Sequence, residues 1–65
     1  MLKTRDIIKL LEDKGFIFFR ANKHLIYKQL TNNITVAVPN QRTCSKGLCR
    51  RILQQAGFLR SEINF

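Results

Sequence analysis

Hydrophobic side chains recur at helical spacing in two segments, one near each end of the chain. In residues 5–14 the isoleucines and leucines fall on one side of a helix and the charged side chains on the other, which predicts an amphipathic helix. Thr4 is placed to cap its start, and Gly15 follows its end, where a left-handed residue is favoured. Residues 45–56 predict a second helix, which Gly57 closes in the same way. Its apolar stripe consists of Leu48, Cys49, Ile52, Leu53 and Ala56.

Three shorter segments between these helices have the composition of β-strands. Residues 16–20, with the sequence FIFFR, are aromatic and branched and directly follow a glycine, which favours a strand over further helix. Residues 23–30 predict a second strand, and a TNN turn leads into a third strand at residues 34–38. The third strand has one clearly apolar face. In the second strand, the alternation of apolar and polar residues does not decide which face points inward. Pro39 ends the sheet, and residues 40–44 form a polar, basic loop.

The order of helix, three strands and helix predicts an α+β fold of two layers. In this α-β-β-β-α arrangement two helices cover one face of a three-stranded antiparallel sheet, because each helix has one apolar stripe to bury. The chain has 65 residues, of which 45% are hydrophobic, with three glycines and one proline, and this favours a packed structure over disorder. We therefore expect one domain over residues 1–65, with a small core and no large substrate cleft.

The strongest feature of the composition is its positive charge. Lysine and arginine number 12 against 4 acidic residues, which gives a formal net charge of +8 and an isoelectric point near 10.4. Such a surface attracts polyanions, and nucleic acid is the commonest of them. An anionic membrane is the rival, but we expect no membrane partner, because the sequence has no long apolar run and no dominant basic amphipathic helix. The N-terminal segment lacks the features of a signal peptide, so we expect a cytoplasmic location.

Cationic side chains gather in two parts of the sequence. Those of the loop and the second helix fit a phosphate backbone, although a solvated helix face is the alternative for each of them. They are Arg42, Lys46, Arg50 and Arg51. The second group surrounds the only histidine, and its members either hold a phosphate there or serve as ordinary charges at a strand edge. They are Arg20, Lys23 and Lys28.

His24 is the only histidine in the sequence and stands at the start of the second predicted strand. Imidazole takes up and returns protons near neutral pH, as ribonuclease chemistry requires, and the alternative is an ordinary surface or edge histidine. The acidic residues form no convergent pair, so a nuclease with several acidic ligands around a metal ion is not expected. Zinc is not expected either, because Cys44 and Cys49 lack a second ligand pair. We interpret both cysteines as reduced thiols and expect neither a metal nor another cofactor.

Aromatic residues are the remaining groups that commonly contact nucleic acids. Tyr27 is the candidate for stacking on a base. The phenylalanines are assigned to the core instead. They are Phe16, Phe18, Phe19 and Phe58.

Four segments resemble a known family, the HicA-type toxins, which are small proteins that cleave messenger RNA in bacterial and archaeal toxin–antitoxin pairs. The segments are LLEDKGF in the first helix, NKHLIYK at the second strand, ITVAVPNQR at the end of the sheet and GLCRRILQQAGF in the second helix. The resemblance covers nearly the whole chain and implies a fold similar to a double-stranded-RNA-binding domain. It also implies that His24 is catalytic and that a cognate HicB-type antitoxin inhibits the protein.

The sequence departs from the family pattern in two places near the implied active site. The usual Gly-Ser before the histidine is Asn22 and Lys23, and Gln41 stands where many members have a second histidine. Asn22 tolerates a positive φ and can take the place of the glycine. With a single histidine, Lys23, Lys28, Tyr27 or water would have to complete the proton transfers.

The residues and the resemblance together predict the toxin of a toxin–antitoxin pair, a metal-independent endoribonuclease that cleaves messenger RNA with one catalytic histidine. We expect its partners to be RNA and the antitoxin, with a monomeric free protein and a hetero-oligomeric complex. Two alternatives stay open: a catalytically silent RNA-binding module of the same fold, and a basic protein that docks on an acidic partner. Binding without cleavage would indicate the first, and partner binding without RNA affinity would indicate the second.

Overall fold

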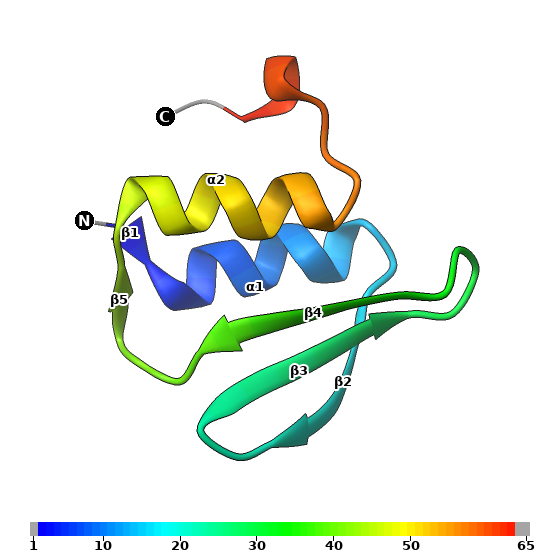
Figure 1. Ribbon diagram of the computed structural model, residues 1–65, viewed down its shortest axis with the longest axis horizontal. Coiled ribbons are helices and arrows are strands. Elements are labelled where there is room, and N and C mark those ends of the chain that lie inside the picture. Colours follow the sequence, from blue (N-terminus) through cyan, green and yellow to red (C-terminus); the bar gives the residue numbers. More distant parts are fainter. Residues whose placement is uncertain (1, 64–65) are drawn as a thin grey trace.

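The computed structural model describes residues 2–63 as an α+β fold with two helices and a three-stranded antiparallel sheet (Figure 1). Both predicted helices and all three predicted strands are confirmed, with ends that differ by no more than one residue. Two short strands and a 3-10 helix are additional to the predicted elements. In chain order the elements are β1 (Leu2–Lys3), α1 (Thr4–Asp13), β2 (Ile17–Ala21), β3 (His24–Gln29), β4 (Ile34–Pro39), β5 (Thr43–Cys44), α2 (Lys46–Gln55) and the 3-10 helix η1 (Arg60–Glu62).

The main sheet has the strand order β2-β3-β4, and neighbouring strands are antiparallel. Directly opposite residues of an antiparallel pair share one face of the sheet. Tyr27 is opposite Val36, and both are buried beneath the helices, so the structure determines which face of β3 points inward. The inward residues of β3 are Leu25, Tyr27 and Gln29, and the outward residues are His24, Ile26 and Lys28.

Strand β2 does not follow a simple alternation, because its pairing with β3 shifts register between Phe18 and Arg20. The extra residue, Phe19, forms a β-bulge. Strand β2 is also an edge strand, and all five of its residues are exposed. Phe18 and Phe19 are 53% and 54% exposed, so the prediction that they belong to the core is wrong. Phe16 is buried and Phe58 packs partly buried against the core, as predicted.

The core lies between the two helices and the inward face of the sheet, and the helices lie in contact with each other along it (Figure 1). Ile7 and Leu11 extend from α1 into this core, and Ile52 and Leu53 extend from α2. Burial of each such side chain stabilises the fold by about 1.5–3 kcal/mol relative to exposure. The amphipathic pattern of the two helices therefore decides their packing.

The two helices finish alike but begin differently. Gly15 and Gly57 follow them with φ values of 94° and 96°, which confirms the predicted left-handed positions. At the start of α2 the Ser45 hydroxyl accepts a hydrogen bond of 3.3 Å from the Leu48 amide. The prediction that Thr4 caps α1 is wrong: Lys3 is the N-cap residue and makes no side-chain cap bond. Thr4 is already helical and buried, because strand β1 runs directly into the helix.

Part of the predicted loop at residues 40–44 is a strand. Residues Thr43–Cys44 form β5, which pairs antiparallel with β1 through Leu2 opposite Cys44 and Lys3 opposite Thr43. This pairing ties the start of α1 to the segment that leads into α2. Within the described residues, neither helix is long and apolar enough to cross a bilayer.

Candidate nucleic-acid interface

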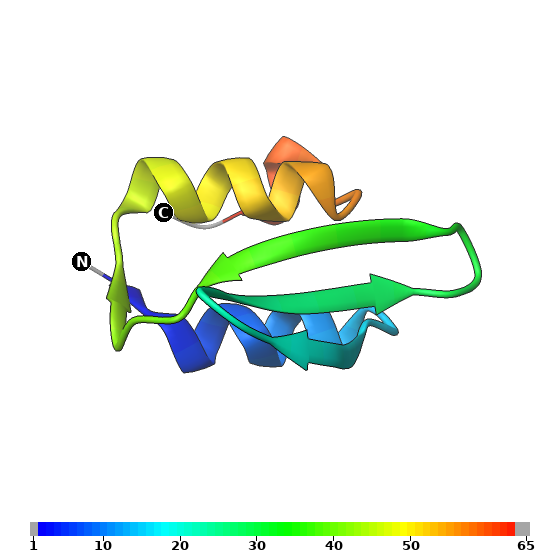
Figure 2. The ribbon, with the colours of Figure 1, turned by 60° about the horizontal axis from the view of Figure 1, so that its bottom comes forward.

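Both helices begin at the same end of the molecule, and β3 begins and β4 finishes there as well (Figures 1 and 2). Cations are carried by four separate segments at this end: β1 with the start of α1, the end of β2 with the turn that follows it, the loop before β5, and the start of α2. We call it the basic end. It is defined by six exposed residues, Lys3, Arg5, Arg20, Lys23, Arg42 and Lys46.

Acidic residues are concentrated at the opposite end, where both helices finish. Glu12 and Asp13 are the last two residues of α1. Glu62 is the last residue of η1, and its Oε2 lies 3.7 Å from the Nζ of Lys14, just after α1. Asp6, in the first turn of α1, is the exception. Because the helix dipole places partial positive charge at a helix N-terminus, the starts of both helices strengthen the positive potential of the basic end.

His24 is the first residue of β3 and is exposed on the outward face of the sheet at the basic end. It pairs with Pro39 at the end of β4. The Asn22 amide donates a hydrogen bond of 3.0 Å to the His24 carbonyl oxygen and so holds the preceding turn. A depression of about 370 Å³ is lined by Asn22, Lys23, His24 and Ile26. A ligand in this depression would touch the imidazole and a cation together.

The turn before His24 does not use a left-handed residue. Among the non-glycine residues that the structure describes, a positive φ occurs at Asn33, with a value of 55°, and at no other position. The expectation that Asn22 takes a positive φ in place of the family's glycine is therefore wrong. The turn that precedes His24 therefore closes without a left-handed residue.

The spacing along β3 separates His24 from one of its predicted proton partners. Lys28 lies on the same face but four residues away, which corresponds to about 13 Å along a strand. Its ammonium group lies over the ring of Phe19, 3.9 Å from the ring centroid. Lys28 is therefore too distant to exchange a proton directly with the imidazole, and Lys23 or water is left for that step.

Tyr27 belongs to the core. It is 6% exposed and packs edge-on against Phe18, with 5.7 Å between the ring centroids. Burial and, to a lesser extent, the charge of Glu12 raise the pKa of Tyr27 above its ordinary value of 10.0. The prediction that Tyr27 stacks on a base is wrong, because its place in the core leaves no ring face open to a nucleotide. The same burial removes it as a proton carrier for His24.

The seven predicted phosphate contacts fall into two groups in the structure. Arg20, Lys23, Arg42 and Lys46 belong to the basic end as defined above. Lys28 lies further along β3, and Arg50 and Arg51 lie four and five residues beyond Lys46 in α2, or about 6–8 Å along the helix axis. All except Lys28 are exposed, and Lys28 is half-buried. Of these seven cations, Lys23 lines the same depression as His24.

Two cations of the basic end, Lys3 and Arg5, are missed by reasoning from the sequence. The sequence predicts that Arg5 lies on the solvated side of the first helix, and Lys3 precedes every predicted element. The pairing of β1 with β5 brings both beside Arg42. One local signal could have identified them: cations are unfavourable at a helix N-terminus, where the dipole favours anions. Lys3 and Arg5, which flank the first helical residue, therefore indicate an anionic partner.

The two cysteines lie beneath the basic end and provide no nucleophile. Cys44 and Cys49 are free thiols that are 2% and 0% exposed. Burial and then the hydrogen bond with Cys44 raise the pKa of Cys49 to about 12. Because the thiolate is the reactive form, Cys49 is inert at neutral pH. Across residues 2–63, no three histidine, cysteine or acidic side chains come together as ligands for a metal ion.

Comparison with known families gives a match over most of the chain. A family model described as the HicA toxin of bacterial toxin-antitoxin matches residues 4–58, from the first residue of α1 to just beyond α2. The matched segment contains His24 and every cation of the basic end except Lys3. No curated protein matches the chain.

Proposed function

The chain belongs to the HicA family of toxins, and from this premise we propose that it is an endoribonuclease that cleaves cytoplasmic messenger RNA with His24 as its catalytic residue. The observation that carries the proposal is an exposed imidazole that shares a depression with Lys23 at the basic end. The basic end carries six cations, and their combined potential attracts a phosphodiester backbone. The substrate strand would lie across the basic end with one phosphate beside His24.

The proposed reaction uses the substrate's own ribose and no metal ion. His24 takes the proton of a ribose 2′-hydroxyl, and the 2′-oxygen attacks the adjacent phosphorus. The bond from phosphorus to the 5′-oxygen breaks, and this oxygen takes up a proton as it leaves. The products are a 2′,3′-cyclic phosphate and a 5′-hydroxyl end. The cations beside the phosphate stabilise the negative charge that builds up on its oxygens during the attack.

The second proton transfer depends on a group other than histidine. Gln41 lies in the loop after β4, and its amide neither gives nor takes a proton near neutral pH. Lys23 is adjacent to His24 and is the nearest cationic donor in sequence, and water is the alternative. General acid–base catalysis by one positioned side chain contributes about 10²–10⁴-fold to a rate. We therefore expect slower cleavage than two histidines would support.

Membership of this family implies a cognate antitoxin, and we propose that it is a HicB-type protein that covers the outward face of the sheet. This face carries His24 and lies opposite the helices. Ile17 and Phe19 are 52% and 54% exposed on β2, and exposed apolar side chains of this size are typical of a protein contact. An acidic antitoxin surface would complement the net charge of +8 and exclude RNA from His24.

The test compares wild type with His24→Ala in cells and with purified proteins. We expect wild type to arrest growth without its antitoxin and to cleave a defined messenger RNA in the presence of EDTA. His24→Ala should lose at least about 100-fold in cleavage rate but keep RNA affinity within about threefold. Lys9→Ala is the matched control, because Lys9 is exposed on α1 and lines neither His24's depression nor the basic end.

The ends of the RNA products test the chemistry separately. A 2′,3′-cyclic phosphate on the products of wild type supports attack by the ribose hydroxyl. Cleavage by His24→Ala at the wild-type rate would overturn the catalytic assignment. RNA that stays intact while wild type binds it would identify a silent RNA-binding module, which the Gln41 substitution favours.

A further inference from the structure

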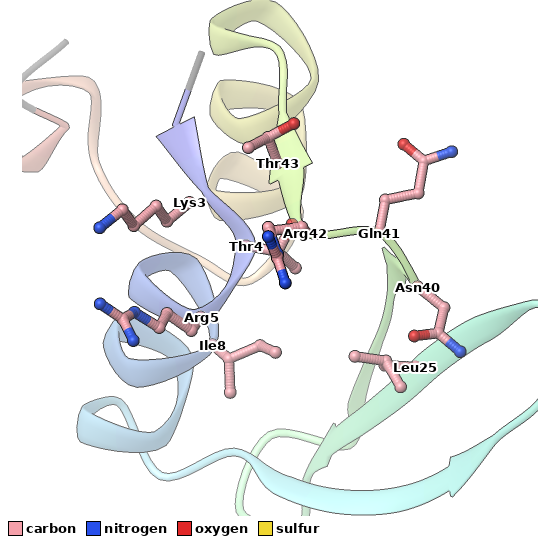
Figure 3. Close-up of a pocket in the computed structure, with 9 residues that line it drawn as sticks. All are labelled: Lys3, Thr4, Arg5, Ile8, Leu25, Asn40, Gln41, Arg42 and Thr43. Carbon is pink, nitrogen blue, oxygen red and sulfur yellow. The ribbon is translucent and has the colours of Figure 1, made fainter.

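A cavity of about 680 Å³ opens at the basic end, between the start of α1 and the end of the main sheet (Figure 3). We call it the α1 cavity. Thr4 and Ile8 of α1 line it, together with Leu25 of β3 and Arg42 of the loop before β5. It differs from the depression at His24, because Leu25 and His24 are neighbours on β3 that point to opposite faces of the sheet.

The start of α1 at this cavity has no side-chain cap. The N-cap residue, Lys3, makes no such bond, and the Thr4 amide donates to the Arg42 carbonyl oxygen at 3.0 Å. The next amides, beginning with that of Arg5, have no acceptor within the helix, because the first turn of any helix leaves its amides without one. Such amides bind anions at the N-termini of helices. The start of α2 differs, because Ser45 caps it.

Thr4 gives an independent indication of a ligand. Its side chain is 4% exposed, it lines the α1 cavity, and its Oγ1 is buried without a hydrogen-bond partner in the described part of the chain. A buried hydroxyl without a partner is unfavourable, and valine would fill the same volume without that penalty. Packing alone therefore does not explain a threonine here. Because this oxygen is covered, an anion in the cavity supplies the missing acceptor only when the side chains over the hydroxyl move aside.

The charges at the α1 cavity also favour an anion. Lys3, Arg5 and Arg42 line it, and none of the nine lining residues is acidic. Within residues 2–63, none of these three cations forms an ion pair with a carboxylate. Figure 3 shows the Arg42 side chain beside Thr4, whereas Lys3 and Arg5 extend together along the other side of α1. Arg42 is thus the direct contact, and the other two strengthen the local potential.

The remaining wall of the α1 cavity is apolar. Ile8 and Leu25 point toward one another across it in Figure 3, and both are half-buried. The volume lies within the range of about 300–1,000 Å³ that is typical of small-molecule sites. An inorganic anion would leave this wall unused. The combination of an anion site and an apolar wall fits a nucleotide, whose phosphate is joined to a ribose and a flat base.

We propose that the α1 cavity binds one nucleotide of the RNA strand. The phosphate would contact the first-turn amides of α1, the Thr4 hydroxyl and Arg42, and the ribose or base would pack between Ile8 and Leu25. The inference rests on the proposed function for the source of the nucleotide, which is a strand that continues around the end of the sheet to His24. Thr4 and Arg42 are binding residues that position this strand, and neither touches the reacting atoms.

The experiment titrates ¹⁵N-labelled wild type with adenosine 5′-monophosphate, adenosine and inorganic phosphate, and follows the amide signals by NMR. The monophosphate should cause saturable shifts at Arg5, Asp6 and Ile7 in the first turn of α1. Adenosine should bind at least about 10-fold more weakly, because it lacks the phosphate. Inorganic phosphate should shift the same amides with several-fold lower affinity, because it cannot use the apolar wall.

Three variants define the contacts. Thr4→Val should weaken binding of the monophosphate at least about threefold while leaving the melting temperature equal or higher, and Thr4→Ser should restore binding. Arg42→Gln should weaken binding about 10-fold, whereas Lys9→Gln removes an equal charge from an exposed site outside the cavity and should have no effect beyond twofold. A purely structural role for Thr4 predicts loss of stability instead, and no change in affinity.

The outcomes separate this site from the proposed function, because the monophosphate has no internucleotide bond to cleave. Absence of shifts in the first turn of α1, equal affinity for adenosine, or unchanged affinity in Thr4→Val would overturn the nucleotide site, while cleavage dependent on His24 would stand. Equal affinity for inorganic phosphate would overturn the role of Ile8 and Leu25. Conversely, if His24→Ala still cleaves RNA, the proposed function fails, but the monophosphate titration still tests binding at the α1 cavity.

Discussion

The two ends of the molecule are built from the same helices and the same sheet, but they satisfy their polar groups to different extents. At the opposite end, the Gly15 and Phe16 amides each donate a hydrogen bond of 3.0 Å to carbonyl oxygens of α1. Gln29 Nε2 donates to the Lys14 carbonyl oxygen at 2.6 Å and ties β3 to the end of α1. At the basic end, the Thr4 hydroxyl has no partner within the described residues, and α1 has no side-chain cap.

This difference indicates that the two ends of this small protein have different roles, one in stability and the other in binding. A core of this size rarely supplies more than about 3–5 kcal/mol of net stability. Grouped cations and a buried hydroxyl without a partner both reduce that margin, so the fold alone does not account for them. The opposite end closes α1 onto β3 with hydrogen bonds, whereas the start of α1 at the basic end keeps donors and positive charge available to an anionic partner.

The largest effect is expected from charge reversal at the basic end. In a His24→Ala background, which should keep RNA intact, Arg42→Glu with Lys46→Glu should weaken RNA binding about 100-fold at low salt. The slope of log affinity against log salt should become less steep by about 1.4, because each contact with a single-strand phosphate contributes about 0.7. Fluorescence anisotropy with a labelled single-stranded RNA measures both quantities.

The matched control changes the same total charge elsewhere. Lys9→Glu with Arg60→Glu alters two exposed cations, one in the middle of α1 and one in η1. We expect this pair to weaken RNA binding less than fivefold. An equal loss in both double variants would show that only net charge matters, and the distinction between the two ends would fail.

The next largest effect concerns the thiols beneath the basic end. The pKa of Cys49 is raised from 9.0 to about 12, so the folded state keeps a proton that the unfolded state releases. The free energy of unfolding should therefore be highest below pH 9 and fall as pH rises from about 9 toward 12, by up to about 1.4 kcal/mol per pH unit. The raised pKa of Tyr27 acts in the same direction.

Urea unfolding under reducing conditions at pH 7.5 and pH 10.5 measures this dependence. Cys49→Ala removes the thiol, so its stability should fall less between the two pH values than that of wild type. The same pH dependence in wild type and Cys49→Ala would contradict the assignment of the effect to Cys49.

A smaller effect on stability is expected when glycine is replaced by alanine at one position at each end of the molecule. A Cβ at Gly57 or at Gly47 would meet no atom within 4 Å, so the two positions differ in backbone conformation and not in space. Gly57→Ala should cost about 1 kcal/mol, because its φ of +96° is left-handed. Gly47→Ala, in the first turn of α2, should gain about 0.5 kcal/mol. Denaturant unfolding measures both, and equal signs would contradict the account of the helix ends.

Most of the fold follows from local sequence patterns. The amphipathic stripes, the glycines after each helix and the alternation in β4 fix these elements to within one residue. The pairing of β1 with β5 could not be predicted, because strands of two residues have no periodicity to detect. The exposure of Phe18 and Phe19 could not be predicted either, because it depends on a bulge and on the edge position of β2.

The candidate site was less accessible to sequence reasoning than the fold. The residue type and the family resemblance both point to His24, but the basic end is assembled from four segments that are distant in sequence. The inward face of β3 decides that Tyr27 is buried and His24 exposed, and this face is set by pairing with β4. Local sequence predicts that Thr4 caps the helix, but in the structure Thr4 follows β1 as the first helical residue and is buried.

The most direct test of the central claim is the single-turnover cleavage rate of His24→Gln at saturating RNA, measured beside its free energy of unfolding. Glutamine keeps a polar side chain at this exposed position but cannot carry a proton. The account predicts a rate at least about 100-fold below that of wild type, with stability within about 0.5 kcal/mol. A wild-type rate in a folded His24→Gln protein would contradict the claim that this imidazole performs the reaction.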